Sequence, residues 1–420
     1  MPFFFVTRKP RLLWANPFCL LDTSSGASMS VRQMLHQLIG KGVEIRILGA
    51  TNFDHENGTK RFADNWEKVK ETKGNIINVK DEKLIHQLVK TRNTDRRKMS
   101  VLESDVFLSS YIKILDEYKP DLVWFYGGGV LDRHIPYEAR IRKIPSAAYL
   151  VNENYKSKDW CKDVDLIVTD TQSTSDFYKN SYGFVPKPVG KFIPESEYLA
   201  KTHERKNILF INPSIEKGAA LVATLAMTME KTRPDIRFNV VQSRGDWEKI
   251  VRATAKTWGE ERNKLDNVDV IPHTDDMRKV YESARILLVP SLWYESGARV
   301  IVEAMMNGIP VFATDRGGSP ELMKGTGILI KLDEKIYKSP YTKLPKRDLL
   351  QPLIKKIEEY FDNQELYMKQ SQQARDAYEK YLSISRSTDR LLYLFKPLLD
   401  LKAGDNDFSS DMKKYHKHGI

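Results

Sequence analysis

The chain has 420 residues, of which 41% are hydrophobic and 29% are charged. This composition excludes wholesale disorder, and the length exceeds what one hydrophobic core organises, so we expect two domains and a tail. Cys19 and Cys161 lie far apart without metal-ligand or redox spacing, which excludes a disulfide scaffold and fits a reducing compartment. The net charge of +11 suits nucleic acid, an anionic membrane or a phosphorylated small molecule. Because no nucleic-acid-binding motif accompanies it, we do not expect a nucleic-acid partner.

Neither a membrane span nor a signal peptide is expected. No run approaches the ~20 apolar residues that cross a bilayer, and the apolar start, residues 1–6, is too short for a signal-peptide core. We therefore expect a cytoplasmic protein. Residues 3–5 are phenylalanines followed by Arg8 and Lys9, which suggests peripheral attachment to the inner face of an anionic membrane. An equal alternative is that the phenylalanines cover the first sheet. A second basic cluster, open to the same two interpretations, consists of Arg92, Arg96, Arg97 and Lys98.

The first half of the chain predicts alternating strands and helices. Residues 11–18 are typical of a buried strand, a polar loop with Gly26 and a helical pattern follow, and residues 43–48 suggest a second strand. This order is the opening unit of a doubly wound parallel sheet. Residues 60–100 are polar and basic, and predict a solvated helix and loop. Further strands are expected at 119–125, 146–151 and 165–169.

A second α/β set begins near residue 206, so the sequence predicts an α/β protein with two Rossmann-like domains facing a cleft. C-terminal helices are expected from about residue 347. The predicted boundaries are 1–197 for an acceptor-binding domain, 198–375 for a donor-binding domain, 376–404 for helices that pack back, and 405–420 for a polar tail.

The most informative segment is 290–311, PSLWYESGARVIVEAMMNGIPV. Glu295 falls on the loop after a buried strand, and Glu303 lies about two turns into the following helix. Both would lie near the carboxyl ends of the strands, where open α/β sheets bind ligands. The helix start, Gly297, Ala298, Arg299 and Val300, offers backbone N–H groups that suit a phosphate. A carboxylate can accept hydrogen bonds from two neighbouring hydroxyls, so Glu303 suits a ribose and Glu295 a sugar.

Two further loops follow predicted strands. Residues 212–218 place Lys217 within reach of a diphosphate, and residues 315–321 form a second glycine turn with Gly317 and Gly318. With these motifs the chain resembles the family-4 glycosyltransferases of the GT-B fold. The resemblance covers most of the chain and is most specific between Glu295 and Val311.

The resemblance implies a retaining transfer from a nucleotide-sugar, in which the nucleotide-sugar is a substrate and neither cofactor nor metal is bound. It places Glu303 on the ribose, Glu295 on the transferred sugar, and Lys217 with the 297–300 amides on the departing diphosphate. Gly26 would let the backbone approach the acceptor or the diphosphate. The implied acceptor is a glycan or a lipid-linked molecule of surface or secreted glycan synthesis.

Three positions depart from the family pattern. Asn212 stands where an arginine is usual, so one diphosphate-binding charge is missing or supplied elsewhere. Gly297-Ala298 replaces the usual Phe-Gly, which changes the sugar pocket. Asn152 and Glu153 lie where a His-Asp pair is common, and Asn152 is our candidate for contacting the reacting sugar.

Other functions remain open on the sequence. A sugar-nucleotide epimerase and a non-catalytic sugar-nucleotide-binding subunit are the alternatives, and a phosphorylase would need a pyridoxal phosphate lysine for which there is no motif. Asp163 and Asp165 mimic a metal-binding Asp-x-Asp, but they precede a strand rather than end one. We therefore expect a structural junction there.

Overall fold

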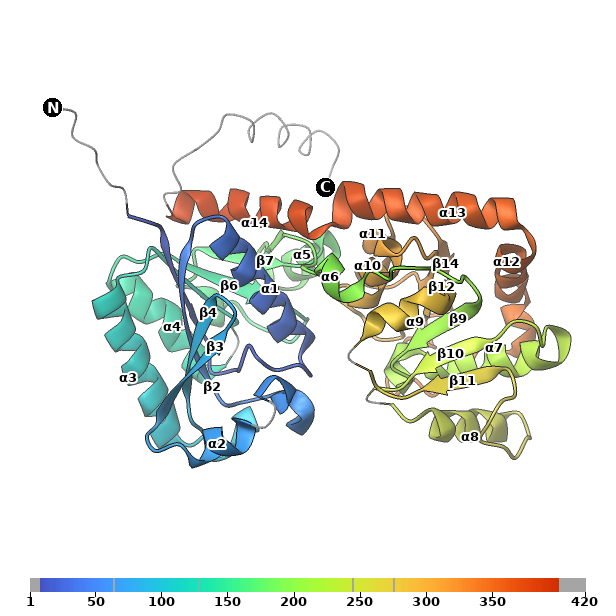
Figure 1. The fold of residues 1–420 in the computed structure, drawn as a ribbon, viewed down its shortest axis with the longest axis horizontal. Helices are drawn as coiled ribbons and strands as arrows, with labels where there is room; N and C mark the ends of the chain where they lie inside the picture. The colour runs from blue at the N-terminus through green and yellow to red at the C-terminus, as the bar shows by residue number, and fades with distance from the viewer. Residues whose placement is uncertain (1–7, 63–64, 128, 244, 275, 400–420) are drawn as a thin grey trace. The chain divides into compact units, whose positions relative to one another are not determined.

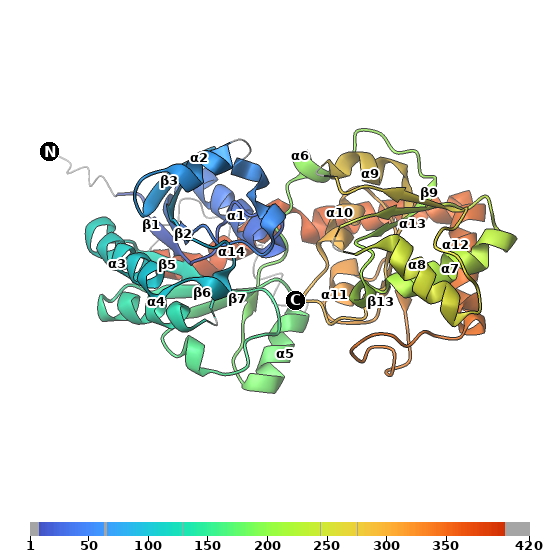
Figure 2. The same cartoon turned by 90° about the horizontal axis from the view of Figure 1, so that it is seen from below.

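The structure is a computed structural model and describes residues 8–62, 65–127, 129–243, 245–274 and 276–399. The chain divides into two compact units. Unit 1 comprises Met1–Phe192 and Ser387–Ile420, and unit 2 comprises Ile193–Arg386. Each unit contains one sheet flanked by helices (Figures 1 and 2), which confirms the predicted α/β class with two Rossmann-like sheets and C-terminal helices.

Unit 1 contains an eight-stranded sheet among its described residues. Its strands are β1 Arg11–Ala15, β2 Glu44–Ala50, β3 Ile76–Asp81, β4 Leu84–Val89, β5 Leu122–Phe125, β6 Ser146–Leu150, β7 Leu166–Thr169 and β8 Lys187–Pro188. Its helices are α1 Gly26–Gly40, η1 Glu56–Phe62, α2 Asn65–Glu71, η2 Arg96–Lys98, α3 Val101–Tyr118, α4 Val130–Ile141, η3 Asp159–Cys161, α5 Gln172–Tyr182 and most of α14 Ile384–Leu399. The strand order is β3-β4-β2-β1-β5-β6-β7-β8, parallel throughout except for the β3–β4 pair.

Alternation along the central strands of unit 1 divides its core between the two faces of the sheet. Leu13 and Val123 pack in one cluster with α3, α4 and α5, and Figure 1 shows α3 and α4 side by side. Trp124, which directly follows Val123 in β5, points to the other face and contacts Trp14 and Phe395 of α14 edge to face. Because successive side chains of a strand point to opposite faces, both faces of this sheet are covered, as a parallel sheet requires.

The prediction of a solvated helix and loop over residues 60–100 was wrong. β3 and β4 form an antiparallel hairpin at the edge of the sheet, and β4 also pairs with β2 in parallel. The short helix α2 precedes this hairpin. Burial alternates along the edge strand β3, where Ile77 is buried and Asn78 and Lys80 are exposed. These polar side chains made the strand resemble a solvated segment, because polar and charged residues occupy the exposed face of an edge strand.

Unit 2 contains a six-stranded parallel sheet among its described residues, in the order β11-β10-β9-β12-β13-β14. Its strands are β9 Asn207–Ile211, β10 Phe238–Val241, β11 Val268–Ile271, β12 Ala284–Val289, β13 Val311–Thr314 and β14 Ile328–Ile330. Its helices are α6 Glu195–Tyr198, η4 Ile215–Lys217, α7 Ala219–Thr232, α8 Trp247–Thr257, α9 Met277–Ser283, α10 Arg299–Met306, α11 Ser319–Met323, η5 Arg347–Leu350, α12 Gln351–Asp362, α13 Gln364–Ala377 and η6 Tyr378–Leu382.

The core of unit 2 also has two layers. Ile208 and Phe210 of β9 pack with α7, α8 and α12, whereas Leu209 packs with α9, α10 and α13. The order places the loops after β9, β12 and β13 next to one another at the carboxyl edge of the sheet, which is where ligands bind in this architecture.

The chain returns to unit 1 through α14, the first residues of which still belong to unit 2. Within unit 1, Arg390 donates from Nε to the carbonyl of Val189 at 3.0 Å, and Phe395 lies against Trp124 with ring centroids 4.8 Å apart. The predicted polar tail, 405–420, and Phe3–Phe5 lie outside the described residues. Among the helices that are described, none is long and apolar enough to span a membrane.

Candidate active site

Two loops at the carboxyl edge of the unit 2 sheet are fastened to each other. The backbone amides of Leu292 and Trp293 both donate to the carbonyl of Glu216, at 2.8 and 3.1 Å. Beside them Gly218 has a φ of +79°, and a side chain there would collide with the carbonyl of Pro290. Glycine is therefore required both for the left-handed conformation and for the close approach. Since β9 and β12 are neighbours, this contact brings the loop after each strand against the other.

The fastened loops place Lys217 directly on Glu295. Nζ of Lys217 donates to Oε1 of Glu295 at 2.6 Å, and the Ser291 hydroxyl donates to the same oxygen. The exposed fractions of the two charged side chains are 29% and 12%. This pair therefore keeps a cation and a carboxylate together at a partly open position, where either can turn to a ligand.

The glycine turn after β13 supports the backbone of Glu295. The amide of Gly318 donates to the Glu295 carbonyl at 2.8 Å. Gly317 has a φ of +60°, and a side chain there would collide with the same carbonyl. The third sequence motif thus holds the first glutamate in place.

Glu303 is buried on α10, with 4% of its surface exposed. The hydroxyl of Tyr281 donates to its Oε2 at 2.6 Å, and Nε of Arg299 lies 3.5 Å from its Oε1. Burial, followed by the charge of Glu303, raises the pKa of Tyr281 well above its usual value, so this hydroxyl stays a neutral donor. No motif of the sequence indicates Tyr281, because packing in a shared core is what brings α9 and α10 together.

The helix that bears Glu303 follows the β12 loop as predicted, but Glu303 lies about one turn into it rather than two. α10 begins at Arg299 after Ala298, and no side chain caps it. The amides of its first turn have no partner carbonyl within the helix. The Arg299 guanidinium is directed to Glu303 and to the Tyr198 hydroxyl, which it reaches at 3.2 Å. The binding capacity of this segment for a phosphate therefore rests on backbone N–H groups.

Asn212 directly follows β9 with a φ of +65°, and its amide donates to the Val241 carbonyl at 3.0 Å. Asparagine tolerates this left-handed conformation better than most residues with a side chain. Another cation of the same sheet edge is Arg316, which lies over the rings of Tyr294 and Tyr337 at 5.8 and 4.7 Å and directly precedes Gly317.

The two candidate residues of unit 1 lie beside one cavity. Gly26 is the first residue of α1, and the next residue, Ala27, lines a cavity of about 390 Å³ together with Asn152. Asn152 follows β6, accepts from the Asn154 amide through Oδ1 at 3.0 Å, and accepts from Tyr178 through its carbonyl at 2.5 Å. Both candidates are thus at the carboxyl edge of the unit 1 sheet.

The Asp-x-Asp mimic has structural contacts. Asp163 pairs with Arg140 at 2.9 Å, and Asp165 accepts from the amide of Ser146 at 2.7 Å. The two residues lie between η3 and β7, as expected of a junction.

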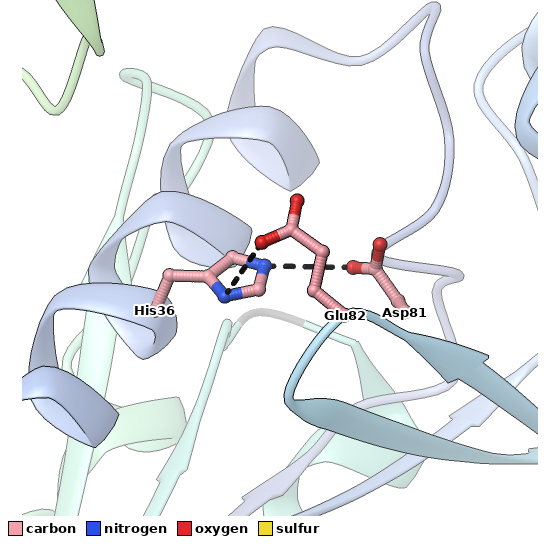
Figure 3. A group of neighbouring side chains, drawn as sticks. All are labelled: His36, Asp81 and Glu82. Atoms are coloured by element: carbon pink, nitrogen blue, oxygen red, sulfur yellow. Dashed lines mark ion pairs between the residues drawn. The ribbon is translucent and has the colours of Figure 1, made fainter.

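A second polar cluster connects α1 to the β3–β4 hairpin. His36 lies 3.6 Å from Asp81 and 3.9 Å from Glu82 (Figure 3). Their ligand-type atoms lie within 4.8 Å of one another. However, the buried Arg32 guanidinium donates to Asp81 at 2.5 and 2.8 Å and to Glu82 at 3.2 Å. Because this cation already pairs with both carboxylates, we assign the cluster to fastening the hairpin.

Known glycosyltransferases are similar to this chain in sequence. Residues 195–335, which include every candidate residue of unit 2, match the family model of glycosyl transferases group 1. This match and the two Rossmann-like sheets together support a GT-B glycosyltransferase. The chain is also 24% identical over 333 residues to a protein named "Putative glycosyltransferase YtcC" of Bacillus subtilis (strain 168), covering 76% of this chain and 74% of that protein.

Solved glycosyltransferase-type structures share the whole fold. Sucrose-phosphate synthase from Thermosynechococcus elongatus is similar with a TM-score of 0.65 and 14% identity, over 94% of this chain and 100% of that chain. Anabaena Alr3699/HepE in complex with UDP is similar with a TM-score of 0.63 and 13% identity, over 93% and 100%. At these identities the likeness establishes the fold alone.

Proposed function

We propose that the chain is a retaining glycosyltransferase that moves a sugar from a nucleoside diphosphate sugar to a glycan or lipid-linked acceptor. The observation that supports this most directly is the Lys217–Glu295 pair, which two glycine loops hold ahead of the helix that bears the buried Glu303. HepE, a structural neighbour, was solved with UDP and glucose, which adds support for a nucleotide-sugar donor.

In this proposal the donor separates the pair. Lys217 turns toward the diphosphate, where negative charge grows as the glycosidic bond breaks, and Glu295 accepts hydroxyls of the transferred sugar. The amides of Gly297, Ala298, Arg299 and Val300 surround the same phosphates, and Glu303 binds the ribose. We assign the cation missing at Asn212 to Arg316, because aromatic rings hold its guanidinium beside the Glu295 loop.

The site needs no metal in this proposal, since lysine, arginine and a helix start supply the positive charge that a divalent ion would provide. Asn152 and the start of α1 at Gly26 contribute from unit 1 by contacting the acceptor or the reacting sugar. The function belongs to the synthesis of a surface or secreted glycan on the cytoplasmic side of a membrane.

The experiment begins with a thermal-shift screen of nucleoside diphosphates and their sugars. A ligand at 100 times its dissociation constant stabilises a folded protein by about 2.7 kcal/mol. The donor selected in this way is then incubated with candidate acceptors in the presence of EDTA, and proton NMR of the product records the anomeric configuration. Inverted product, or activity that requires added Mn²⁺, contradicts the proposal. Isomerised nucleotide-sugar formed without acceptor would instead identify an epimerase.

A further inference from the structure

Two adjoining cavities open at the carboxyl edge of the unit 1 sheet. The smaller, of about 390 Å³, is bordered by the first turn of α1, and the larger, of about 1110 Å³, extends toward α3 and α4. Both are lined by Phe18, Asp54, Arg96 and Gly129. Arg96 therefore lies where the two cavities meet.

Arg96 is fixed in this position by three neighbours. Nη2 donates to Oδ2 of the buried Asp132 at 2.5 Å, and the guanidinium carbon lies 4.6 Å from the centre of the Phe18 ring. A side chain at Gly129 would collide with the guanidinium. Asp132 is itself held by the amide of Gly129 at 2.9 Å and by the Asn16 side chain at 3.2 Å. One nitrogen is used in the bond to Asp132, and a guanidinium has five N–H donors in all.

The opposite wall of the smaller cavity also offers donors. Ser25, Ala27 and Ser28 lie in the cap and first turn of α1, a 15-residue helix with no acidic residue in that turn. The positive end of such a helix favours a negative charge. Tyr126 also lines the cavity, with 5% of its surface exposed, and its hydroxyl lies beside the Ser28 side chain of the same helix start. Arg96 and this helix start therefore present donors to one cavity.

From this arrangement we propose that the acceptor carries an acidic group, a phosphate or a carboxylate, bound between Arg96 and the first turn of α1. Asp54 is the acidic residue that lines both cavities, and it is exposed, where water weakens its repulsion. The inference deepens the proposed function, on which it rests, by naming the chemical class of the acceptor.

The larger cavity accommodates the rest of the acceptor. Its wall includes Met99, Leu108 and Leu131, and at its mouth Val130 is 78% exposed. Large exposed apolar side chains beside a cavity mark a surface that binds an apolar group. The acidic group is therefore attached to a remainder that is at least partly apolar, as in a phospholipid or a sugar phosphate that carries an apolar aglycone.

The test is isothermal titration of the full chain with inorganic phosphate and, separately, with glucose 6-phosphate and glucose. All titrations use a Lys217→Met background, so that phosphate binding in unit 2 is weakened. Arg96→Met should weaken phosphate binding by about 10- to 100-fold, the loss expected of one charge-assisted hydrogen-bonding side chain. Arg133→Met removes the same charge from an exposed side chain of α4 that lines neither cavity, and should leave binding unchanged.

Because Arg96→Met leaves Asp132 buried without its cation, the double variant Arg96→Met/Asp132→Asn removes the pair together and guards against misfolding. Phosphate that binds equally to the parent and to both Arg96 variants overturns the inference, as does glucose 6-phosphate that binds no better than glucose. Co-sedimentation with phosphatidylcholine vesicles, with and without phosphatidylglycerol, separates a lipid headgroup from a free sugar phosphate as the source. UDP binding and its loss in Glu303→Ala are measured separately, so failure of the donor site is distinguishable from failure of the Arg96 site.

Discussion

Lys217 and Glu295 are 78 positions apart in the chain, yet Nζ and Oε1 lie 2.6 Å from each other. Neither residue is on the same element as the other, and their contact depends on the hydrogen bonds that join the loops after β9 and β12. Each member neutralises the other until a ligand competes for both. This relationship determines how variants of the site should behave.

Replacing Lys217 by Ala should lower turnover by roughly 10²–10³-fold, because it removes positive charge from the departing diphosphate. Glu295→Ala should impair use of the intact donor more than binding of the free nucleoside diphosphate. The measurements are kcat with saturating donor and the dissociation constants of donor and diphosphate. If both variants are folded and turn over like the parent, the reaction takes place at another site.

Glu303→Ala should weaken binding of the nucleoside diphosphate by about 1.5–3 kcal/mol per lost charge-assisted hydrogen bond. Calorimetry on the ligand selected by thermal shift measures this directly. Glu261→Ala, an exposed glutamate of the same unit, is the matched control and should bind like the parent. Equal affinity in all three proteins contradicts a ribose role for Glu303.

Gly317→Ala should abolish most activity, because its side chain would displace the backbone of Glu295. Gly325→Ala is a matched control: its φ of +77° imposes a similar backbone strain, of about 1 kcal/mol, but nothing lies within 4 Å of the added atom. Both variants should lose stability in urea, and Gly317→Ala should lose more because of the collision, whereas only Gly317→Ala should lose turnover. Comparable activity in the two variants would show that the glycine turn does not position Glu295.

The cluster around Asp81 predicts how acid affects stability. Burial lowers the pKa of His86 below the ordinary histidine value, although Asp81, with which it forms a contact of 3.5 Å, opposes this shift. The unfolded chain then binds a proton that the folded chain does not, so the free energy of unfolding should fall as the pH drops below about 6.5. Burial raises the pKa of Asp81, but contacts with His36, His86 and Arg32 outweigh it and hold this pKa well below its usual range. Protonation of Asp81 therefore adds a further loss of folding stability below about pH 4.

Urea unfolding between pH 8 and pH 5 measures the histidine effect, with both limits set around the ordinary histidine pKa of about 6.5. His86→Gln should flatten the pH dependence, whereas the exposed His134→Gln should retain it. A parent protein whose stability does not change over this range would contradict the prediction.

Peripheral attachment to an anionic membrane remains a prediction of the basic surface. Arg96 and Arg97 are paired with Asp132 and Asp95, so Arg92 and Lys98 are the members of the cluster we expect to contact lipid. Val101 and Leu102, each 77% exposed, lie close to them in the sequence. Each basic residue near such a surface contributes about 1 kcal/mol. Co-sedimentation with phosphatidylglycerol vesicles should therefore fall at high salt and in Lys98→Glu, and binding that ignores salt would contradict it.

The sequence predicted the two sheets because buried parallel strands are continuous apolar runs, of which residues 286–289 are an example. It also indicated Lys217 and Glu295 through the loops that follow such strands. It did not indicate Tyr281 or Arg96, because the position of each depends on partners brought near by packing: Glu303 for the first, and Asp132 with Phe18 for the second. The β3–β4 hairpin was missed for another reason, since the polar side chains of its solvated edge and turn, such as Asn78, Lys80 and Lys83, interrupt its apolar residues.

Unit 1 is assembled from both ends of the chain, because α14 supplies Phe395 to the face of the sheet that bears Trp124. During synthesis, that face must stay incomplete until almost the whole polypeptide has been made, whereas unit 2 is contiguous and can fold earlier. We therefore expect a stop codon ahead of α14 to release a chain with a folded second unit and an aggregation-prone first unit. A truncation of this kind would be sensitive to chaperone supply in a way that point variants of the donor site are not.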